Sequence, residues 1–142
     1  MTMGIAKRLL KDAATIFAPL GENEDGVMQY ETYVFENVFC RAGAGMTING
    51  GQNPADTLDL YVFDTSSAVT VNGDERDVAT ACEGIFDIIR NTPTDIDTAE
   101  KIYVLPYASK DTTPPSMSRR VSSVVRRAAG AKRLWHWEVH GK

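Results

Sequence analysis

The closing stretch RLWHWEVHG, residues 133–141, decides the fold predicted for this chain. Side chains of an extended strand alternate between its two faces. One face is apolar and carries Trp135, Trp137 and Val139. The other face carries the remaining side chains, Leu134, His136, Glu138 and His140. Two indole rings on one face favour a strand that closes a mainly β core.

The second face reads His-x-Glu-x-His over residues 136–140, and imidazoles and carboxylates are common zinc ligands. Alternate side chains on a flat strand stand about 6.5 Å apart, which is too far for direct ligation of one ion. No Cys/His cluster elsewhere in the sequence completes a coordination shell. We therefore expect a polar outer face without a metal ion or other cofactor.

Further strands are predicted where β-branched and aromatic residues lie between turn signals. They fall in residues 26–43 (one long strand or a bent pair), 56–66, 67–72, 101–105 and 121–125, before the closing strand 133–139. Asn72-Gly73 is a favoured hairpin turn. The expected core residues on two of these strands are Leu58, Leu60, Val62, Trp135, Trp137 and Val139.

Two segments show a helical rather than an alternating pattern. In residues 4–21 the apolar side chains recur at roughly helical spacing, and Pro19 and Gly21 end the run. This spacing predicts an amphipathic N-terminal helix, either a lid on the core or an arm onto a neighbour.

The second such segment, residues 77–93, can be interpreted in two ways. One helical face would carry Val78, Cys82, Ile85, Phe86 and Ile89. Gly84 weakens a helix by about 1 kcal/mol relative to Ala. We favour a short helix that crosses the β body and ends before Pro93.

The whole pattern predicts a mainly β fold, a small β-barrel or sandwich of about six strands with an N-terminal helix and one inserted short helix. The 142 residues fit a single domain, with residues 1–21 as a helical arm and 22–142 as the β-barrel body. Cys40 and Cys82 form no CxxC motif and are expected to be reduced thiols. No apolar run approaches the length of a membrane span, so we expect no membrane partner.

Charge is unevenly distributed along the chain. Residues 1–118 hold 8 Lys/Arg and 18 Asp/Glu, a net charge of −10, whereas residues 119–142 hold 7 Lys/Arg and one acid, a net charge of +6. Such polarity suits head-to-tail contact between copies or docking on an acidic surface, although a solvated basic strand face is an equal alternative.

No motif indicates an enzyme. The sequence has no GxSxG motif, and the pair Asp95/Asp97 is typical of a solvated turn. The glycine-rich residues 43–51 lack the Lys-Ser/Thr of a phosphate-binding loop. We therefore expect no catalytic and no cofactor-binding residues.

Nucleic-acid binding is an alternative function for the basic C-terminal segment. Arginines and lysines between 119 and 133, together with the two tryptophans, would give a basic stacking surface like that of a small OB-type barrel. Against it, the whole chain is acidic and its aromatic residues are expected to point inward.

The order of segments resembles that of small minor capsid or head–tail connector proteins of tailed bacteriophages and prophages. The residues that carry the resemblance are YVFENVF at 33–39, ADTLDLYV at 55–62, DTAEKIYVLPYA at 97–108 and RLWHWEVHGK at 133–142. In that family an "ADxxxIxIP"-like central strand and an "xHWxVxGx" ending close a β-barrel. The N-terminal helix predicted here and residues 74–91 depart from the family pattern.

The resemblance implies a structural, non-enzymatic subunit of the virion, a stopper or head-closure protein in the neck. Its partners would be copies of itself in a ring and the neighbouring adaptor, portal and tail proteins, with DNA passing through the lumen without sequence-specific binding. We expect the inter-subunit or lumen contacts in the loops 43–54 and 112–118 and on the basic strand. The interface residues predicted there are Gly43, Gly45, Met46, Asn49, Gly50, Gly51, Pro114, Pro115, Arg119, Arg120, Arg126 and Arg127.

Overall fold

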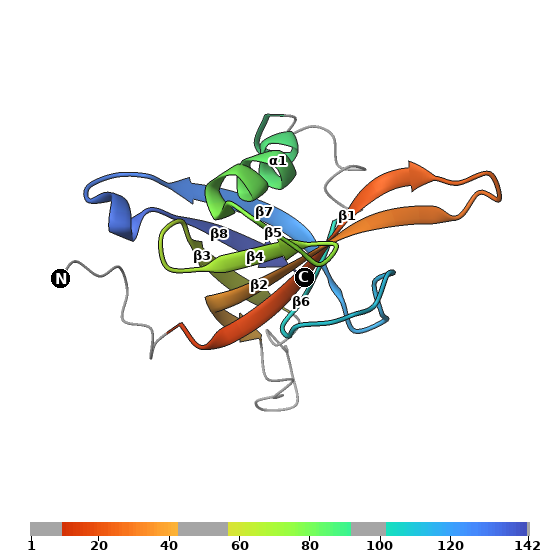
Figure 1. Cartoon of the computed structure of the whole chain (residues 1–142), viewed down its shortest axis with the longest axis horizontal. Helices are drawn as coiled ribbons and strands as arrows, with labels where there is room; N and C mark the ends of the chain where they lie inside the picture. The colour runs from red at the N-terminus through yellow and green to blue at the C-terminus, as the bar shows by residue number, and fades with distance from the viewer. Residues whose placement is uncertain (1–9, 43–56, 92–101, 142) are drawn as a thin grey trace, which may run out of the picture.

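The computed structural model describes residues 10–42, 57–91 and 102–141 (Figure 1). These residues form eight strands and one α-helix, so the prediction of a mainly β protein with an inserted helix is confirmed. In chain order the elements are β1 (Asp12–Glu22), β2 (Met28–Ala42), β3 (Leu58–Phe63), β4 (Ala68–Val71), β5 (Asp74–Arg76), α1 (Val78–Asn91), β6 (Tyr103–Leu105), β7 (Arg119–Arg127) and β8 (His136–Gly141). The number of strands exceeds the predicted six, because β1 replaces the predicted N-terminal helix and the short β5 follows the Asn72-Gly73 turn.

The strand pairings form a closed circuit. β1 pairs with β6, and the order continues through β7, β8, β3 and β2, which pairs back with β1. β4 and β5 extend the sheet from β2 as a hairpin. Every pairing is antiparallel. The circuit therefore brings the N-terminal strand and the closing strand into one sheet.

The first strand corrects the sequence prediction. Over Asp12–Glu22 the chain is a strand and not the amphipathic helix predicted for 4–21, and β1 belongs to the β circuit rather than to a separate arm. Four consecutive residues, 14–17, are buried. A strand that is covered on both faces reads as a continuous apolar run, which periodicity does not separate from a buried helix. Leu20, expected on the apolar helix face, is 63% exposed.

The sequence of residues 26–43 allowed either one long strand or a bent pair, and β2 is one long strand that contains a bend. It runs for 15 residues, pairs with β1 and β4 in its first part and pairs with β3 at its end. Asn37 has a left-handed φ of 55° and stands in a bulge opposite β1. A bulge bends a strand and increases its twist. This bend lets one strand serve two parts of the circuit.

The helix α1 is amphipathic, as its spacing predicts. Asp77 Oδ2 accepts hydrogen bonds from the Thr80 amide and hydroxyl, so this side chain caps the first turn. The apolar face of α1 is buried in the core and consists of Val78, Ala81, Cys82, Ile85 and Phe86. The side chain of Ile89, also predicted there, lies outside the described part.

The predicted core is largely confirmed. Leu58, Leu60, Val62, Trp137 and Val139 are all at most 1% exposed. The hairpin at Asn72-Gly73 is also confirmed, with both residues at positive φ as a tight turn between β4 and β5 requires.

Trp135 is the exception among the predicted core residues. The closing strand begins at His136, because Lys132–Leu134 form a single 3₁₀ turn in place of extended chain. Trp135 follows this turn, is only half-buried, and its indole N–H donates to the Gly130 carbonyl oxygen at 3.2 Å. It therefore packs on the β7–β8 connection and not in the core.

Candidate functional site

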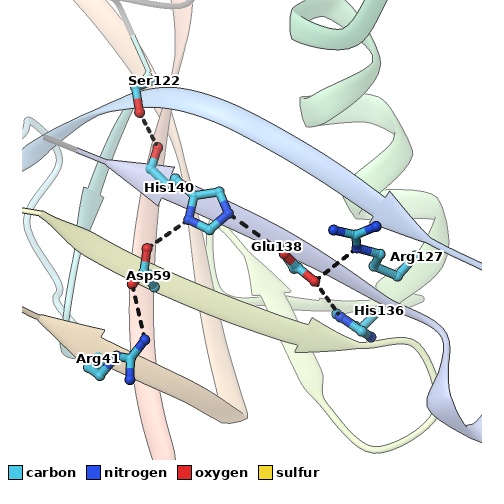
Figure 2. A network of polar contacts seen from close by, with 7 residues as sticks. All are labelled: Arg41, Asp59, Ser122, Arg127, His136, Glu138 and His140. Carbon is cyan, nitrogen blue, oxygen red and sulfur yellow. Dashed lines mark hydrogen bonds and ion pairs between the residues drawn. The ribbon is translucent and has the colours of Figure 1, made fainter.

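A network of polar side chains lies on the outer face of β3 and β8 (Figure 2). We call it the outer-face network, and its side chains are Arg41, Asp59, Arg127, His136, Glu138 and His140. They come from four neighbouring strands of the circuit, β2, β3, β8 and β7.

Strand register brings these side chains together. Asp59 lies opposite His140, and Phe63 lies opposite His136. Arg127 of β7 is also paired with His136, from the other side of β8. Residues directly opposite each other in an antiparallel pair share a face and are in contact. Arg41 of β2 likewise lies opposite Asp59, so the register places two carboxylates, two imidazoles and two guanidinium groups on one surface.

His136 contacts an oxygen atom with each ring nitrogen. Its Nδ1 lies 2.9 Å from the Leu134 carbonyl oxygen, and its Nε2 lies 3.0 Å from Glu138 Oε2. Both oxygens are acceptors, so both hydrogen bonds form together only when both ring nitrogens carry protons.

His140 connects the two carboxylates of the network. Its Nδ1 lies 2.7 Å from Asp59 Oδ1, and its Nε2 lies 3.7 Å from Glu138 Oε1. Arg41 approaches the other Asp59 oxygen at 3.6 Å. The network thus runs without a break from Arg41 of β2 through Asp59, His140 and Glu138 to Arg127 of β7.

Glu138 is the centre of the network, and its environment favours the ionised form. Burial by itself would raise the pKa of Glu138, but hydrogen bonds from His136 and from Arg127 Nε, at 3.1 Å, outweigh burial and lower that pKa. This carboxylate is therefore a fixed negative charge on the outer face.

The His-x-Glu-x-His pattern does not form a metal centre in the described part of the chain. No group of three or more His, Cys, Asp or Glu side chains among these residues is arranged to hold an ion. The imidazoles instead contact carboxylates and a backbone oxygen. Those contacts use the ring nitrogens that a metal ion would need.

Aromatic rings lie beside the network on the same face. Phe39, 40% exposed, stacks on Tyr61 with ring centroids 5.5 Å apart. His136 lies 4.9 Å from the ring of Phe63 and 6.1 Å from that of Tyr61. The outer face therefore combines charged groups with aromatic rings, and of these the aromatic rings are enriched in protein interfaces.

Arg126 lies on the other face of β7, toward the core. Its guanidinium forms two hydrogen bonds with the Asp64 carboxylate, at 2.8 and 2.6 Å, and both side chains are less than 15% exposed. It also stacks on the Trp137 ring, 4.8 Å from the centroid. The hydrogen bond with Asp64 raises the pKa of Arg126 despite its burial. Arg126, predicted as an interface residue, is thus committed to an internal pair.

The other predicted interface residues have different positions. Arg119 and Arg120 begin β7 opposite β6, and Arg127 is bound to Glu138. Pro114 and Pro115 lie half-buried in the β6–β7 connection, where the Ser118 hydroxyl donates to the Pro115 carbonyl oxygen at 2.7 Å. The glycine-rich positions Gly43, Gly45, Met46, Asn49, Gly50 and Gly51 lie outside the described residues.

The two cysteines are shielded thiols. Burial is the main reason that the pKa of Cys40 is raised to about 12, and Asp12 and Asp59 raise it further. Burial likewise raises the pKa of Cys82 far above its usual range. Neither thiol is activated as a nucleophile, since nucleophilic cysteines have lowered pKa values.

The His and Glu residues of β8 could be recognised from their spacing in the sequence, but their partners on other strands could not. Asp59, Tyr61 and Phe63 alternate with core residues in LDLYVF, which was the available signal for a second, outward face. Nothing in the local sequence indicated the ion pair of Asp64, because its partner Arg126 lies 62 positions away.

Comparison with known proteins returns no match, whether to a protein-family model, to a curated protein or to a solved structure. Among residues 10–42, 57–91 and 102–141, no helix is long and apolar enough to cross a membrane.

Proposed function

We propose that this chain is a structural subunit of a phage virion, a stopper or head-closure protein of the head–tail connector. It would assemble in a ring between the portal or adaptor and the tail. The sequence resemblance supports this role, and its two most distinctive segments form the neighbouring strands β3 and β8. We interpret the six-strand circuit as a small barrel, the fold that the resemblance implies.

The observation that carries the proposal is the pairing of the strands, which decides how much sheet edge the described part of the molecule exposes. Each strand of the circuit has a partner strand on both sides, although β6 pairs with only three residues of β1 and with Arg119 and Arg120 of β7. Among the described strands the sheet order ends at β5, which has only three residues. A sheet whose strand order closes on itself has no terminal edge strand within the closed part, which favours association through side chains and projecting loops. Such a body suits a rigid subunit that contacts neighbours through its hairpins.

The surface charges are compatible with a ring around DNA. An acidic surface on the lumen would repel the duplex and let it slide, whereas the basic segment would contact neighbouring subunits. We propose the loops 43–54 and 112–118 as further inter-subunit or lumen contacts.

Electron microscopy of the purified chain, alone and with the proteins encoded beside it, tests the proposal. We expect ring-shaped particles with a central channel, and genes for portal, capsid and tail proteins next to this gene. Absence of rings under both conditions, with unrelated neighbouring genes, would contradict the proposal.

The alternative is a small OB-like nucleic-acid-binding protein, which the same sample tests. It predicts a shift of labelled single-stranded DNA that weakens steeply as salt is raised. The base-stacking groups proposed for it are engaged within the chain, since Trp137 is buried and Trp135 lies under Arg126 and Lys132. The connector role predicts no such shift.

A further inference from the structure

The hairpin of β1 and β2 projects from the body and ends in an acidic turn (Figure 1). Residues 20–27 contain Glu22, Glu24 and Asp25 and no basic residue. Leu20 and Val27 stand beside these acids and are 63% and 52% exposed. We call residues 20–27 the acidic tip.

The acidic tip has a defined shape. The Asn23 side-chain oxygen accepts hydrogen bonds from the amides of Asp25 and Val27, at 2.9 and 3.0 Å. The Asn23 amide donates to the Val27 carbonyl oxygen at 2.9 Å. A turn that is ordered before contact loses less conformational entropy when it binds.

The connection between β7 and β8 ends in a basic turn. Lys132 and Arg133 are exposed in its 3₁₀ helix, next to Leu134, which is 43% exposed. Neither is in an ion pair with another described residue, whereas Arg126 and Arg127 are bound to Asp64 and Glu138. The Lys132 ammonium lies 5.8 Å from the centroid of the Trp135 ring, and that ring supports the turn. We call residues 131–134 the basic tip.

The two tips lie at opposite ends of the long axis of the molecule (Figure 1). Each combines exposed apolar side chains with charges of one sign, and the signs are opposite. We propose that the acidic tip of one copy docks on the basic tip of the next copy. This inference rests on the proposed ring-forming role and names the contact that would build the ring.

The charges of the tips disfavour a symmetric contact, in which two copies would meet through identical tips. Two acidic tips or two basic tips would place like charges together, which costs several kcal/mol in a protein interface. An acidic tip on a basic tip is a heterologous contact, because each copy offers two different surfaces. Such contacts close into a ring when the rotation between copies allows it and otherwise extend as a filament.

Charge reversal at each tip tests the contact. The acidic-tip variant is Glu22→Lys with Glu24→Lys and Asp25→Lys, and the basic-tip variant is Lys132→Glu with Arg133→Glu. Sedimentation velocity at low salt should show self-association of each variant weakened by at least about tenfold, since one tenfold step corresponds to 1.4 kcal/mol. An equimolar mixture should recover association, because each reversed tip then meets a tip of opposite charge.

The matched control reverses three exposed acids away from the tip, Glu36→Lys with Asp74→Lys and Glu75→Lys. It changes the net charge as much as the acidic-tip variant and should associate like the unmodified chain. Circular dichroism verifies that each variant keeps its β content. Loss of association in the control as in the tip variants, or no recovery in the mixture, overturns the proposal.

Oxidative crosslinking provides a second test that also detects weak contacts. A chain with Val27→Cys and Leu134→Cys should give a ladder of crosslinked oligomers, whereas either single substitution should stop at dimers. If the double variant also stops at dimers while rings still form by electron microscopy, the tip contact is wrong and the connector role stands. If the ladder forms but the particles are open filaments, the contact stands and the ring is wrong.

Discussion

The two faces of β8 are stabilised by different kinds of interaction, although their residues alternate along one six-residue strand. On the inner face Trp137 and Val139 are at most 1% exposed and pack in the core. On the outer face His136, Glu138 and His140 remain partly exposed and are joined by hydrogen bonds and ion pairs. Stability is therefore concentrated on one face, and adaptable polar contacts on the other.

The energies of the two faces differ in scale. A buried tryptophan removes roughly 150–250 Å² from water, which corresponds to about 4–6 kcal/mol at 25 cal/mol per Å². An exposed ion pair contributes only about 0–1 kcal/mol, because water and salt screen it. Substitutions on the inner face should therefore lower the free energy of unfolding much more than substitutions on the outer face.

The largest effect is expected from Trp137→Ala. Phe86 of α1 lies 5.3 Å from the Trp137 ring, so the substitution leaves a cavity between helix and sheet. We expect the free energy of unfolding to fall by about 3–5 kcal/mol in urea denaturation followed by circular dichroism. The matched control, Trp135→Ala, should cost less than about 1.5 kcal/mol, since that ring is only half-buried. Equal losses would remove the distinction between the two tryptophans.

An intermediate effect is expected from Arg126→Met. This change keeps an apolar side chain over the Trp137 ring but leaves the Asp64 carboxylate, 13% exposed, without its cation. We expect a loss of about 2 kcal/mol in the same assay.

Two further variants separate charge from packing at this position. Arg127→Met is the control, because that guanidinium is 61% exposed, and it should cost less than about 1 kcal/mol. Adding Asp64→Asn to Arg126→Met should recover part of the loss. No recovery would show that the guanidinium acts by packing alone.

The smallest effect is expected from Glu138→Gln, and it depends on pH. The pKa of Glu138 is lowered in the folded chain, so its ionised form stabilises the fold fully above the ordinary glutamate pKa. That stabilisation is lost as the pH falls through the lowered folded-state pKa. We expect Glu138→Gln to cost less than about 1 kcal/mol at neutral pH and nothing in acid. Thermal unfolding from neutral to acidic pH measures this, with Glu75→Gln as the exposed control. A cost that does not change with pH would contradict the ionic role of Glu138.

Secondary-structure elements were predicted best where one face of a segment is buried and the other is exposed to solvent. LDLYVF and HWEVHG alternate in burial along their whole length, and VATACEGIF buries one helical face, so their periodicity was informative. The prediction for the segment of β1 was wrong because residues 14–17 are buried on both faces of the strand. The apolar residues of such a run fit a helical spacing as well as a buried strand, and its strand form follows only from pairing with β2 and β6.

Local periodicity and turn chemistry were sufficient to predict the mainly β composition, the core residues of β3 and β8, the hairpin at Asn72-Gly73 and the inserted helix. The contacts between residues far apart in the chain could not be predicted in this way, because they depend on the fold. Asp59 reaches His140 from 81 positions away, Arg126 reaches Asp64 from 62, and the two charged tips lie at opposite ends. The register and order of the strands set these contacts, and both depend on closing the circuit rather than on any single segment.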